Sequence, residues 1–428
     1  MSKKYFIKRC QEHVKYFNEN IFLTKIKLLI YSLFPVALII GSAVSEGFVI
    51  LIDIIFLYEL FKNKKFSVLK NRTLFFFLLI WLALIINYLQ SLNQENSLLR
   101  NIFFFEYIIF SFSSFLFFKK DFKRLVLIIN IWFLILLFFS IDLLFQFIFD
   151  FNTIGLTAPM KKHRLSGFFG KEQIAGTFLL YFAFTVCAYK LKYEKNIKSN
   201  FLFLSFFFIM IFLSGERSAF IKSLIIIIPF IFCFNKIKKK YKTISFYIIA
   251  IIFLTTIYFK QTFYTRYVDQ VKESFINFEK TNYGNHYITA YKLFSDNIFF
   301  GVGNKNFRII CNKDSYEFLK NIKYEKSICT THPHQIYLEF LSEHGLFGFS
   351  ILIVFLLTFF CKRILYLLKN KNEIFYLALL MNTLLIFIPF LPSGSFFSSF
   401  NASIFWLNIS ILLAFEKKRK LFHDEKNV

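Results

Sequence analysis

The chain has 428 residues, of which 57% are hydrophobic and 22% aromatic, including 68 phenylalanines. A single soluble core does not need this much apolar surface, so the composition excludes a soluble globular protein. The formal net charge of +26 lies in short clusters between apolar runs, which is typical of the loops of a membrane protein and argues against a nucleic-acid-binding surface.

Long apolar runs follow one another along the chain and predict its fold class. Each is long enough to cross roughly 30 Å of hydrocarbon as a helix. We therefore expect an all-α, polytopic integral membrane protein with about twelve transmembrane helices in a single domain over residues 1–428. The polar, basic N-terminal stretch lacks a small-residue cleavage site, so we expect no cleavable signal peptide. The predicted spans are residues 26–44, 46–61, 73–92, 101–118, 125–148, 172–190, 200–214, 218–235, 243–259, 336–361, 373–391 and 399–415.

Lysine and arginine alternate between the two sides of these spans. Seven alternate segments hold 34 of the 52 basic residues, and the positive-inside rule makes these segments and both termini cytoplasmic. The outward side then contains residues 149–171, residues 214–218 and a large loop at 260–335, before the tenth span. The predicted cytoplasmic segments are residues 1–28, 62–72, 118–125, 190–198, 235–242, 362–372 and 416–428.

Four acidic residues fall within the apolar runs, where an unpaired charge is costly. Two interpretations stay open: a proton or ion path, or neutral and paired contacts between helices. The four residues are Asp53, Glu59, Glu106 and Asp142.

The positions of the six cysteines relative to the membrane predict one disulfide. Only Cys311 and Cys329 fall on the outward, oxidising side, so we expect a bond between them, the alternative being two free thiols.

Two outward segments place cations where an anion could bind. Lys161, Lys162 and Arg164 precede a glycine-rich turn that opens a span, and a helix N-terminus favours anions. Arg217 lies between two spans with almost no loop to lift it into water, and its planar fork suits bidentate binding of phosphate. The alternatives are lipid headgroup contacts and, for Arg217, a salt bridge to Glu216.

The densest polar cluster stands at the mouth of the tenth span. The pair His332 and His334 suggests zinc, but no third outward ligand is placed convincingly, so we expect no metal. A neutral histidine beside carboxylates is instead a plausible general base near pH 7. The other members of the cluster are Glu339, Glu343 and His344.

This segment, HQIYLEFLSEHGLFG at 334–348, resembles the O-antigen ligase and polymerase superfamily, in which a long periplasmic loop ends in a similar stretch. Three further segments look like family elements, in the same order along the chain. They are RLSGFFGKEQIAGTFL (164–179), LSGERSAF (213–220) and SDNIFFGVGNKNF (295–307), the last with Asn297 where proline is usual.

The resemblance implies an enzyme of the bacterial inner membrane that transfers a glycan from undecaprenyl diphosphate with inversion, without metal, nucleotide sugar or other cofactor. His334 would be the essential histidine, supported by His332 and Glu343. Arg217 and Arg164 would bind the donor diphosphate. Many family members carry a further arginine in the loop, but residues 281–291 contain none. Either His286 or Arg266 takes that role, or the third cation is dispensable.

Three functions remain to be weighed. The favoured one is an O-antigen ligase acting on a lipid A-core acceptor, because HPHQ and the paired loop cysteines look more like ligase-type members. The runner-up is an O-antigen polymerase, which would join lipid-linked repeat units with the same donor. The third is a transporter, which would require an inverted repeat and polar sites at the midplane. For all three, membrane lipids are partners and nucleic acids are not.

Overall fold

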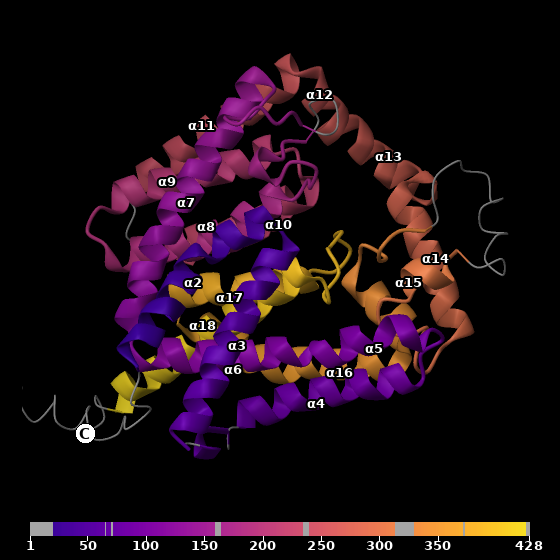
Figure 1. Cartoon of the computed structure of the whole chain (residues 1–428). Coiled ribbons are helices and arrows are strands. Elements are labelled where there is room, and N and C mark those ends of the chain that lie inside the picture. The colour runs from indigo at the N-terminus through magenta and orange to yellow at the C-terminus, as the bar shows by residue number, and fades with distance from the viewer. Residues whose placement is uncertain are drawn as a thin grey trace, which may run out of the picture.

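The computed structural model describes residues 20–64, 66–69, 72–158, 164–233, 239–312, 329–370 and 373–424. These residues form helices and turns, with one isolated β-bridge between Phe151 and Thr157 (Figure 1). The long helices are α2 (Ile21–Ile40), α3 (Ser42–Lys62), α4 (Arg72–Leu89), α5 (Gln94–Phe103), α6 (Phe105–Lys120), α7 (Phe122–Phe149), α8 (Ala175–Tyr193), α9 (Ile197–Leu213), α10 (Arg217–Cys233), α11 (Lys239–Phe259), α16 (Ile336–Lys369), α17 (Ile374–Leu384) and α18 (Ser399–Asp424).

Each of the twelve predicted spans overlaps one of these helices. Among the described residues, six apolar stretches are long enough to cross a membrane, and three shorter apolar helices accompany them. The structure therefore supports an all-helical membrane protein. The six stretches are Ile21–Ile40, Gln94–Lys120, Phe122–Phe149, Lys242–Phe259, Ile336–Lys369 and Ser399–Lys417.

Two span boundaries differ from the prediction for local reasons. Helix α17 ends at Leu384 and continues only as a 3-10 turn, η6 (Leu385–Phe387), because Pro389 disfavours helical backbone at Ile388, which is extended. Residues before 101, expected as a loop, form α5, which begins where the Asn93 side chain accepts the Asn96 N–H at 3.1 Å.

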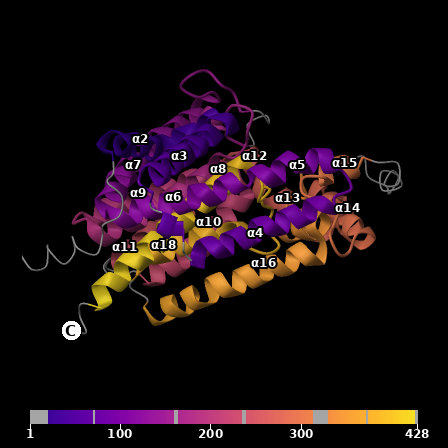
Figure 2. The ribbon, with the colours of Figure 1, turned by 60° about the horizontal axis from the view of Figure 1, so that its bottom comes forward.

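The predicted large loop, 260–335, is mostly helical where it is described. Its elements lie at one end of the molecule, opposite the C-terminus (Figures 1 and 2). They are α12 (Gln261–Tyr264), the π-helical turn η3 (Thr265–Asp269), α13 (Gln270–Ile276), η4 (Phe278–Lys280), α14 (Asn282–Asp296) and α15 (Phe307–Ile310).

Hydrogen bonds join the predicted outward segments to one another. The Leu165 N–H donates to the Ser214 carbonyl at 3.0 Å and the Ser393 N–H to the His334 carbonyl at 2.8 Å. Lys192, in a predicted cytoplasmic segment, pairs at 3.6 Å with Glu373, the first residue of the next-to-last predicted span. These contacts are compatible with the predicted arrangement of the segments, whose orientation relative to the membrane stays a prediction.

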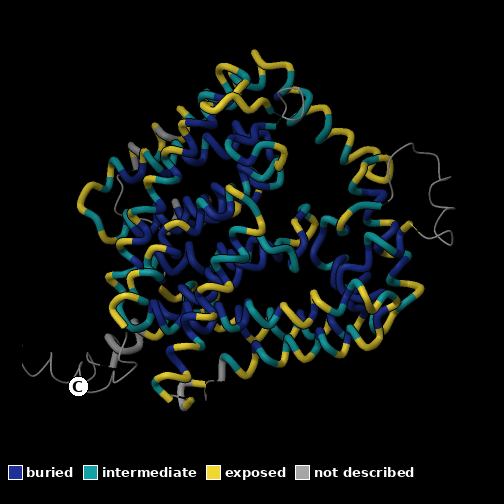
Figure 3. Tube along the Cα trace, in the orientation of Figure 1, coloured by how far each residue is buried: buried dark blue, intermediate teal, exposed yellow. Residues whose placement is uncertain are grey.

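Burial separates central from peripheral helices (Figure 3). In the apolar stretch of α18, 78% of residues are buried, against 17% in α16 and none in α11. Serines allow close approach in the centre, where the Ser111 and Ser410 hydroxyls lie 3.0 Å apart. The exposed apolar faces of α11 and α16 are suited to lipid.

The acidic residues within the predicted spans have different surroundings. Glu59 forms a buried ion pair with Lys27 at 2.7 Å, and Asp142 accepts the Thr153 N–H at 2.9 Å. These two carboxylates therefore have structural partners. Both carboxylate oxygens of Asp53 are buried without a hydrogen-bond partner among the described residues, and Glu106 is half-buried.

Candidate active site

The turn between α9 and α10 fixes Arg217 at the end of the helical body. Gly215 adopts a φ of +71°, which glycine tolerates without a Cβ clash. The Ser214 hydroxyl accepts the Glu216 N–H at 3.3 Å, and α10 begins at Arg217. The chain thus reverses within three residues and leaves Arg217 no loop on which to move away.

The Glu216 carboxylate bonds to α8 and not to Arg217. Its carboxylate accepts the Thr177 N–H at 2.9 Å and also the Thr177 hydroxyl. A side chain at Gly176 would meet the Ser214 hydroxyl at 2.5 Å, so the start of α8 packs tightly on this turn. The Arg217 guanidinium consequently forms no hydrogen bond or ion pair with any described residue.

Two further arginines approach the same turn. Arg164 donates to the Gln173 carbonyl, just before α8, and its Nε is buried without a partner among the described residues. Arg266 of η3 donates to the Gly215 carbonyl at 3.0 Å and to Gln270 at 2.9 Å. Lys161 and Lys162, predicted near Arg164, lie outside the described residues.

All three arginines line one cavity of about 300 Å³. Its other walls are largely apolar and aromatic, from α10, α13, α14 and the segment after α17. These lining residues include Ile221, Val271, Phe275, Phe278, Tyr283, Tyr287, Phe390, Leu391 and Pro392. The cavity thus combines a cationic wall with apolar ones.

The arginines raise the positive potential at one another. Burial, then the charges of Arg217 and Arg164, lowers the pKa of Arg266 to about 10. Burial and the charge of Arg164 also lower the pKa of Arg217, partly offset by Tyr283, Tyr267 and Glu273. Cations held this close are stabilised when an anion enters.

Three histidines lie beside this cavity. His334 stands with its ring centroid 4.1 Å from that of His332 and 5.6 Å from that of His286 on α14. Tyr283, which lines the cavity, has its ring 5.7 Å from that of His334. Tyr283 therefore connects the arginine cavity to the histidines, although no sequence pattern singles it out.

His334 is held in an unusual backbone conformation. Its φ is +59°, rare for a residue with a side chain and costing roughly 1–3 kcal/mol. Its carbonyl accepts the Ser393 N–H at 2.8 Å, and Thr330 lies 3.4 Å from its Nε2. The backbone thus directs the ring towards Tyr283 and His286.

His334 and His332 are kept neutral by their surroundings. Burial, then His286 and Arg164, lowers the pKa of His334 to about 4. Burial, then His334 and Lys305, holds the pKa of His332 well below its usual range. A neutral imidazole can accept a proton, which a general base requires. Among the described residues, no three His, Cys, Asp or Glu side chains converge as metal ligands.

The acidic part of the predicted cluster serves other contacts. The Glu343 carboxylate accepts the Phe307 N–H at 3.1 Å, and Glu339 accepts the Phe396 N–H at 2.9 Å. His344 packs between Phe340 and Phe397. The structure thus divides one sequence cluster: His332 and His334 face the cavity region, whereas the later residues hold segments together.

Glycines explain why residues 298–307 pack directly on α16. The Val302 and Gly303 N–H groups each donate at 2.9 Å to carbonyls of α16. A Cβ at Gly345 would lie 2.4 Å from the Phe299 backbone, and one at Gly301 would lie 2.5 Å from that of Glu343. Gly345 also kinks α16 with a φ of +62°. We call residues 298–307, with their contacts to α4, α5 and α16, the glycine–asparagine junction.

Asparagines complete this junction from α4 and α5. Asn87 donates to the carbonyls of Phe300 and Glu343 and accepts the Asn304 N–H, at 2.9, 3.0 and 3.0 Å. Asn96 donates to Asn306 at 2.9 Å. Sequence reasoning missed these residues, although an asparagine in an apolar run such as Asn87 is a signal for an interhelical contact.

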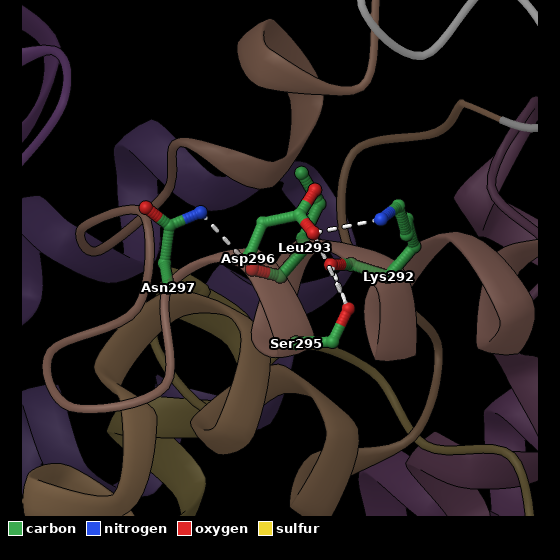
Figure 4. A network of polar contacts seen from close by, with 5 residues as sticks. All are labelled: Lys292, Leu293, Ser295, Asp296 and Asn297. Atoms are coloured by element: carbon green, nitrogen blue, oxygen red, sulfur yellow. Dashed lines mark hydrogen bonds and ion pairs between the residues drawn. The ribbon is translucent and has the colours of Figure 1, made fainter.

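The end of α14 sets the direction in which the junction begins (Figure 4). The Asn297 side chain donates to the Leu293 carbonyl at 3.1 Å, and Lys292 pairs with Asp296 at 2.8 Å. Asn297 therefore caps the helix C-terminus. Proline, which is usual here in the family that this segment resembles, would end the helix because it cannot continue the helical hydrogen bonds.

A disulfide links the chain just after the junction to the segment that carries His332 and His334. Cys311 and Cys329 are bonded, with Cα atoms 5.6 Å apart. Cys311 is fully buried in a small second core with Val302 and Phe307. Because Cys329 lies five residues before His334, the bond restrains the chain that carries the histidines.

Comparison with known proteins bears on the segment that carries most of these residues. Residues 201–353 match the family model described as O-Antigen ligase. This range includes the turn at Arg217, the loop with Arg266 and His286, and the histidine segment up to the start of α16. No curated protein matches the chain. The match over residues 201–353 supports membership of the O-antigen ligase superfamily.

Proposed function

We propose that this protein is an O-antigen ligase-type glycosyltransferase, which transfers a glycan from undecaprenyl diphosphate to a lipid A-core acceptor. The observation that carries the proposal is the cavity lined by Arg164, Arg217 and Arg266, beside the neutral His334. None of these arginines forms an ion pair with a described carboxylate. Superfamily membership supports the more general activity, membrane glycosyl transfer in lipopolysaccharide biosynthesis.

The donor would occupy the arginine cavity. Planar guanidinium groups bind phosphate oxygens through paired hydrogen bonds. The Nε–H of Arg164, which is buried and has no partner among the described residues, can donate one of them. Arg266 lines the cavity, whereas His286 does not. Arg266 would therefore take the role of the loop arginine that many family members carry and that residues 281–291 of this chain lack. Apolar walls such as Phe275 and Phe278 suit the first isoprene units of the lipid.

Transfer needs one proton acceptor and one stabilised leaving group. His334 would take the proton from the acceptor hydroxyl as that oxygen bonds to the anomeric carbon. The bond from this carbon to the diphosphate oxygen then breaks, and its electron pair leaves with the diphosphate. The arginines stabilise the charge that develops there. These bond changes and the proton transfer need no metal or cofactor.

The orientation follows from the same reasoning. The active site would face the periplasm of a bacterial inner membrane, with both termini cytoplasmic, because the predicted outward segments meet at the cavity end. The excess of lysine and arginine in the segments predicted to be cytoplasmic supports this orientation.

A polymerase remains the second candidate, since it uses the same donor and differs in the acceptor. The disulfide beside the HPHQ segment is the feature that favours a ligase. For transport, the polar site would be expected near the midplane, whereas the arginines lie at the end of α10.

His334→Ala tests both the base and the function. It removes one polar side chain outside the apolar core, so we expect inserted, folded protein without transfer activity, and a milder loss for His332→Ala. In cells, a lost ligase leaves long polymer on the lipid carrier and bare lipid A-core, whereas a lost polymerase leaves core capped with one repeat unit. Single-unit capping would replace the ligase by the polymerase, and a normal ladder would refute the site.

A further inference from the structure

A second group of cations lies near the histidines, at the edge of the glycine–asparagine junction. Lys305 is almost completely buried and donates to the Ser395 hydroxyl. Arg308 follows it in α15. The Asn96 side chain donates to the Lys305 carbonyl at 3.0 Å, and Arg100 lies four residues later on the same face of α5. The charges of Arg308 and Arg100 both act on Lys305, so three cations from two distant segments lie near one another.

Arg308 has an unsatisfied donor in a buried position. Its Nε is buried and has no hydrogen-bond partner among the described residues. Burial, then the charge of Arg100, lowers the pKa of Arg308, so the two guanidinium groups repel one another. The Nε of Arg164 in the arginine cavity is likewise buried without a hydrogen-bond partner among the described residues. A buried donor without a partner requires a reason, and a missing anion is one.

Two nearby carboxylates, Glu343 and Glu339, raise the pKa of Arg308 but bond to other groups. Glu343 accepts the Phe307 N–H at 3.1 Å, and Glu339 accepts the Phe396 N–H and the Ser395 hydroxyl. Among the described residues, neither carboxylate forms an ion pair with Arg308 or Arg100. The two arginines keep their donors available.

The histidine pair stands between the two cation groups. The charges of Lys305 and Arg308 act on His332, whereas the charge of Arg164 acts on His334, and the two rings are 4.1 Å apart. In an inverting transfer, the attacking and leaving oxygens lie on opposite sides of the anomeric carbon. An acceptor that reaches His334 opposite the diphosphate must therefore extend towards the second group.

We propose that Arg308 and Arg100 form an anion site that binds a phosphate or carboxylate group of the acceptor glycolipid. This inference rests on the proposed function for its ligand, while the site itself rests on the unpaired guanidinium groups. It assigns the acceptor to one side of the histidines and the donor to the other. Lys305 fixes the position of the chain before Arg308 through its contacts with Asn96 and Ser395. It is not required to touch the ligand.

Binding to the purified full-length protein tests this site independently of transfer. Phosphorylated lipid A-core glycolipid is titrated into wild type, Arg308→Ala, Arg100→Ala and Arg217→Ala. We expect the acceptor affinity to fall about tenfold or more for Arg308→Ala and by less for Arg100→Ala. Each substitution removes a charge-assisted hydrogen bond. Arg217→Ala should bind this acceptor normally. Lys292→Ala, which removes an exposed outward cation paired with Asp296, is the matched control.

Treatment of the acceptor identifies the group recognised. If phosphatase abolishes the difference between wild type and Arg308→Ala, the group is a phosphate; if only carboxyl reduction abolishes it, the group is a carboxylate. A difference that survives both treatments, or no loss of binding in either arginine variant, overturns the site. Arg100→Ala guards against misfolding, because Arg100 is exposed. Absence of glycan transfer by wild type would refute only the proposed function.

Discussion

The arginine cavity and the glycine–asparagine junction are both polar, both lie at the same end of the molecule, and both join segments distant in sequence. They differ in how their polar groups are satisfied. In the junction, Asn87 alone makes three hydrogen bonds to residues more than 200 positions away. In the cavity, Arg217 makes none with the described residues.

This difference separates scaffold from binding surface. Satisfied buried polar groups fix one arrangement of the chain, and the junction fixes where α16 begins and bends. Unsatisfied cations keep their hydrogen-bonding capacity for a ligand. Mutations of the junction's glycines and of Asn87 should therefore act on folding, and mutations in the cavity on activity.

The largest effect is expected for Gly345→Ala in the junction. The new Cβ would meet the Phe299 backbone at 2.4 Å, and the φ of +62° disfavours any side chain. We expect destabilisation of about 3 kcal/mol or more, measured as loss of folded protein in detergent by thermal unfolding. Gly47→Ala is the matched control, because a Cβ at that position would meet nothing within 4 Å. Equal stability of the two variants would contradict the assigned role of the junction.

A smaller and different effect is expected for Arg217→Lys in the cavity. The charge stays but the planar fork is lost, so transfer should fall about 10- to 100-fold, the cost of one charge-assisted hydrogen bond at about 1.5–3 kcal/mol. Thermal unfolding should be unchanged. Arg124→Lys, at the opposite end beside Asp121, should retain activity. Full transfer by the Arg217 variant would reduce this residue to a headgroup contact.

Sequence could predict most of the fold because the membrane imposes a simple rule. Apolar runs long enough to span hydrocarbon must be helices, and each of the twelve predicted ranges overlaps a helix, while six described stretches are long and apolar enough to cross a membrane. The positions of individual ends depended on local chemistry, such as Pro389 after α17. The helices within 260–335 carry no such apolar run, so their existence could not be inferred from length and hydropathy.

The candidate site was predictable only as separate residues. Arg164, Arg217, Arg266 and His334 were selected from the sequence, but their meeting depends on how α8, α10 and η3 pack, which no local pattern encodes. Tyr283 and Arg308 were missed for the same reason. Glu343 was assigned a supporting role near the histidines, whereas its carboxylate accepts the Phe307 N–H, a contact that spans 36 residues of sequence.

The pH dependence of transfer should reveal the cavity's charge. His334 acts as a base when deprotonated, and its pKa of about 4 means that kcat/KM should fall only as pH drops towards that value. Arg164→Gln removes a cation that lowers this pKa, so the acid limb should move to higher pH. Bound diphosphate should also raise the pKa, placing the acid limb of kcat above that of kcat/KM. Identical limbs in wild type and Arg164→Gln would show that the arginine does not act on His334.

The smallest effect is expected at the Cys311–Cys329 disulfide, which joins the chain just after the junction to the segment that carries His332 and His334. Closing a loop with a sequence separation of 18 is worth on the order of 3 kcal/mol in the loop-entropy model, but α16 and the junction retain their own hydrogen bonds. Reduction should therefore loosen only the segment that leads to His334, lowering transfer a few-fold while donor binding at the arginines persists. The thiols should react with a membrane-impermeant maleimide after reduction and not before. Labelling without reductant would mean that the two cysteines are free, and the position of the histidines would then depend on the Ser393 contact and the fold of α16 alone.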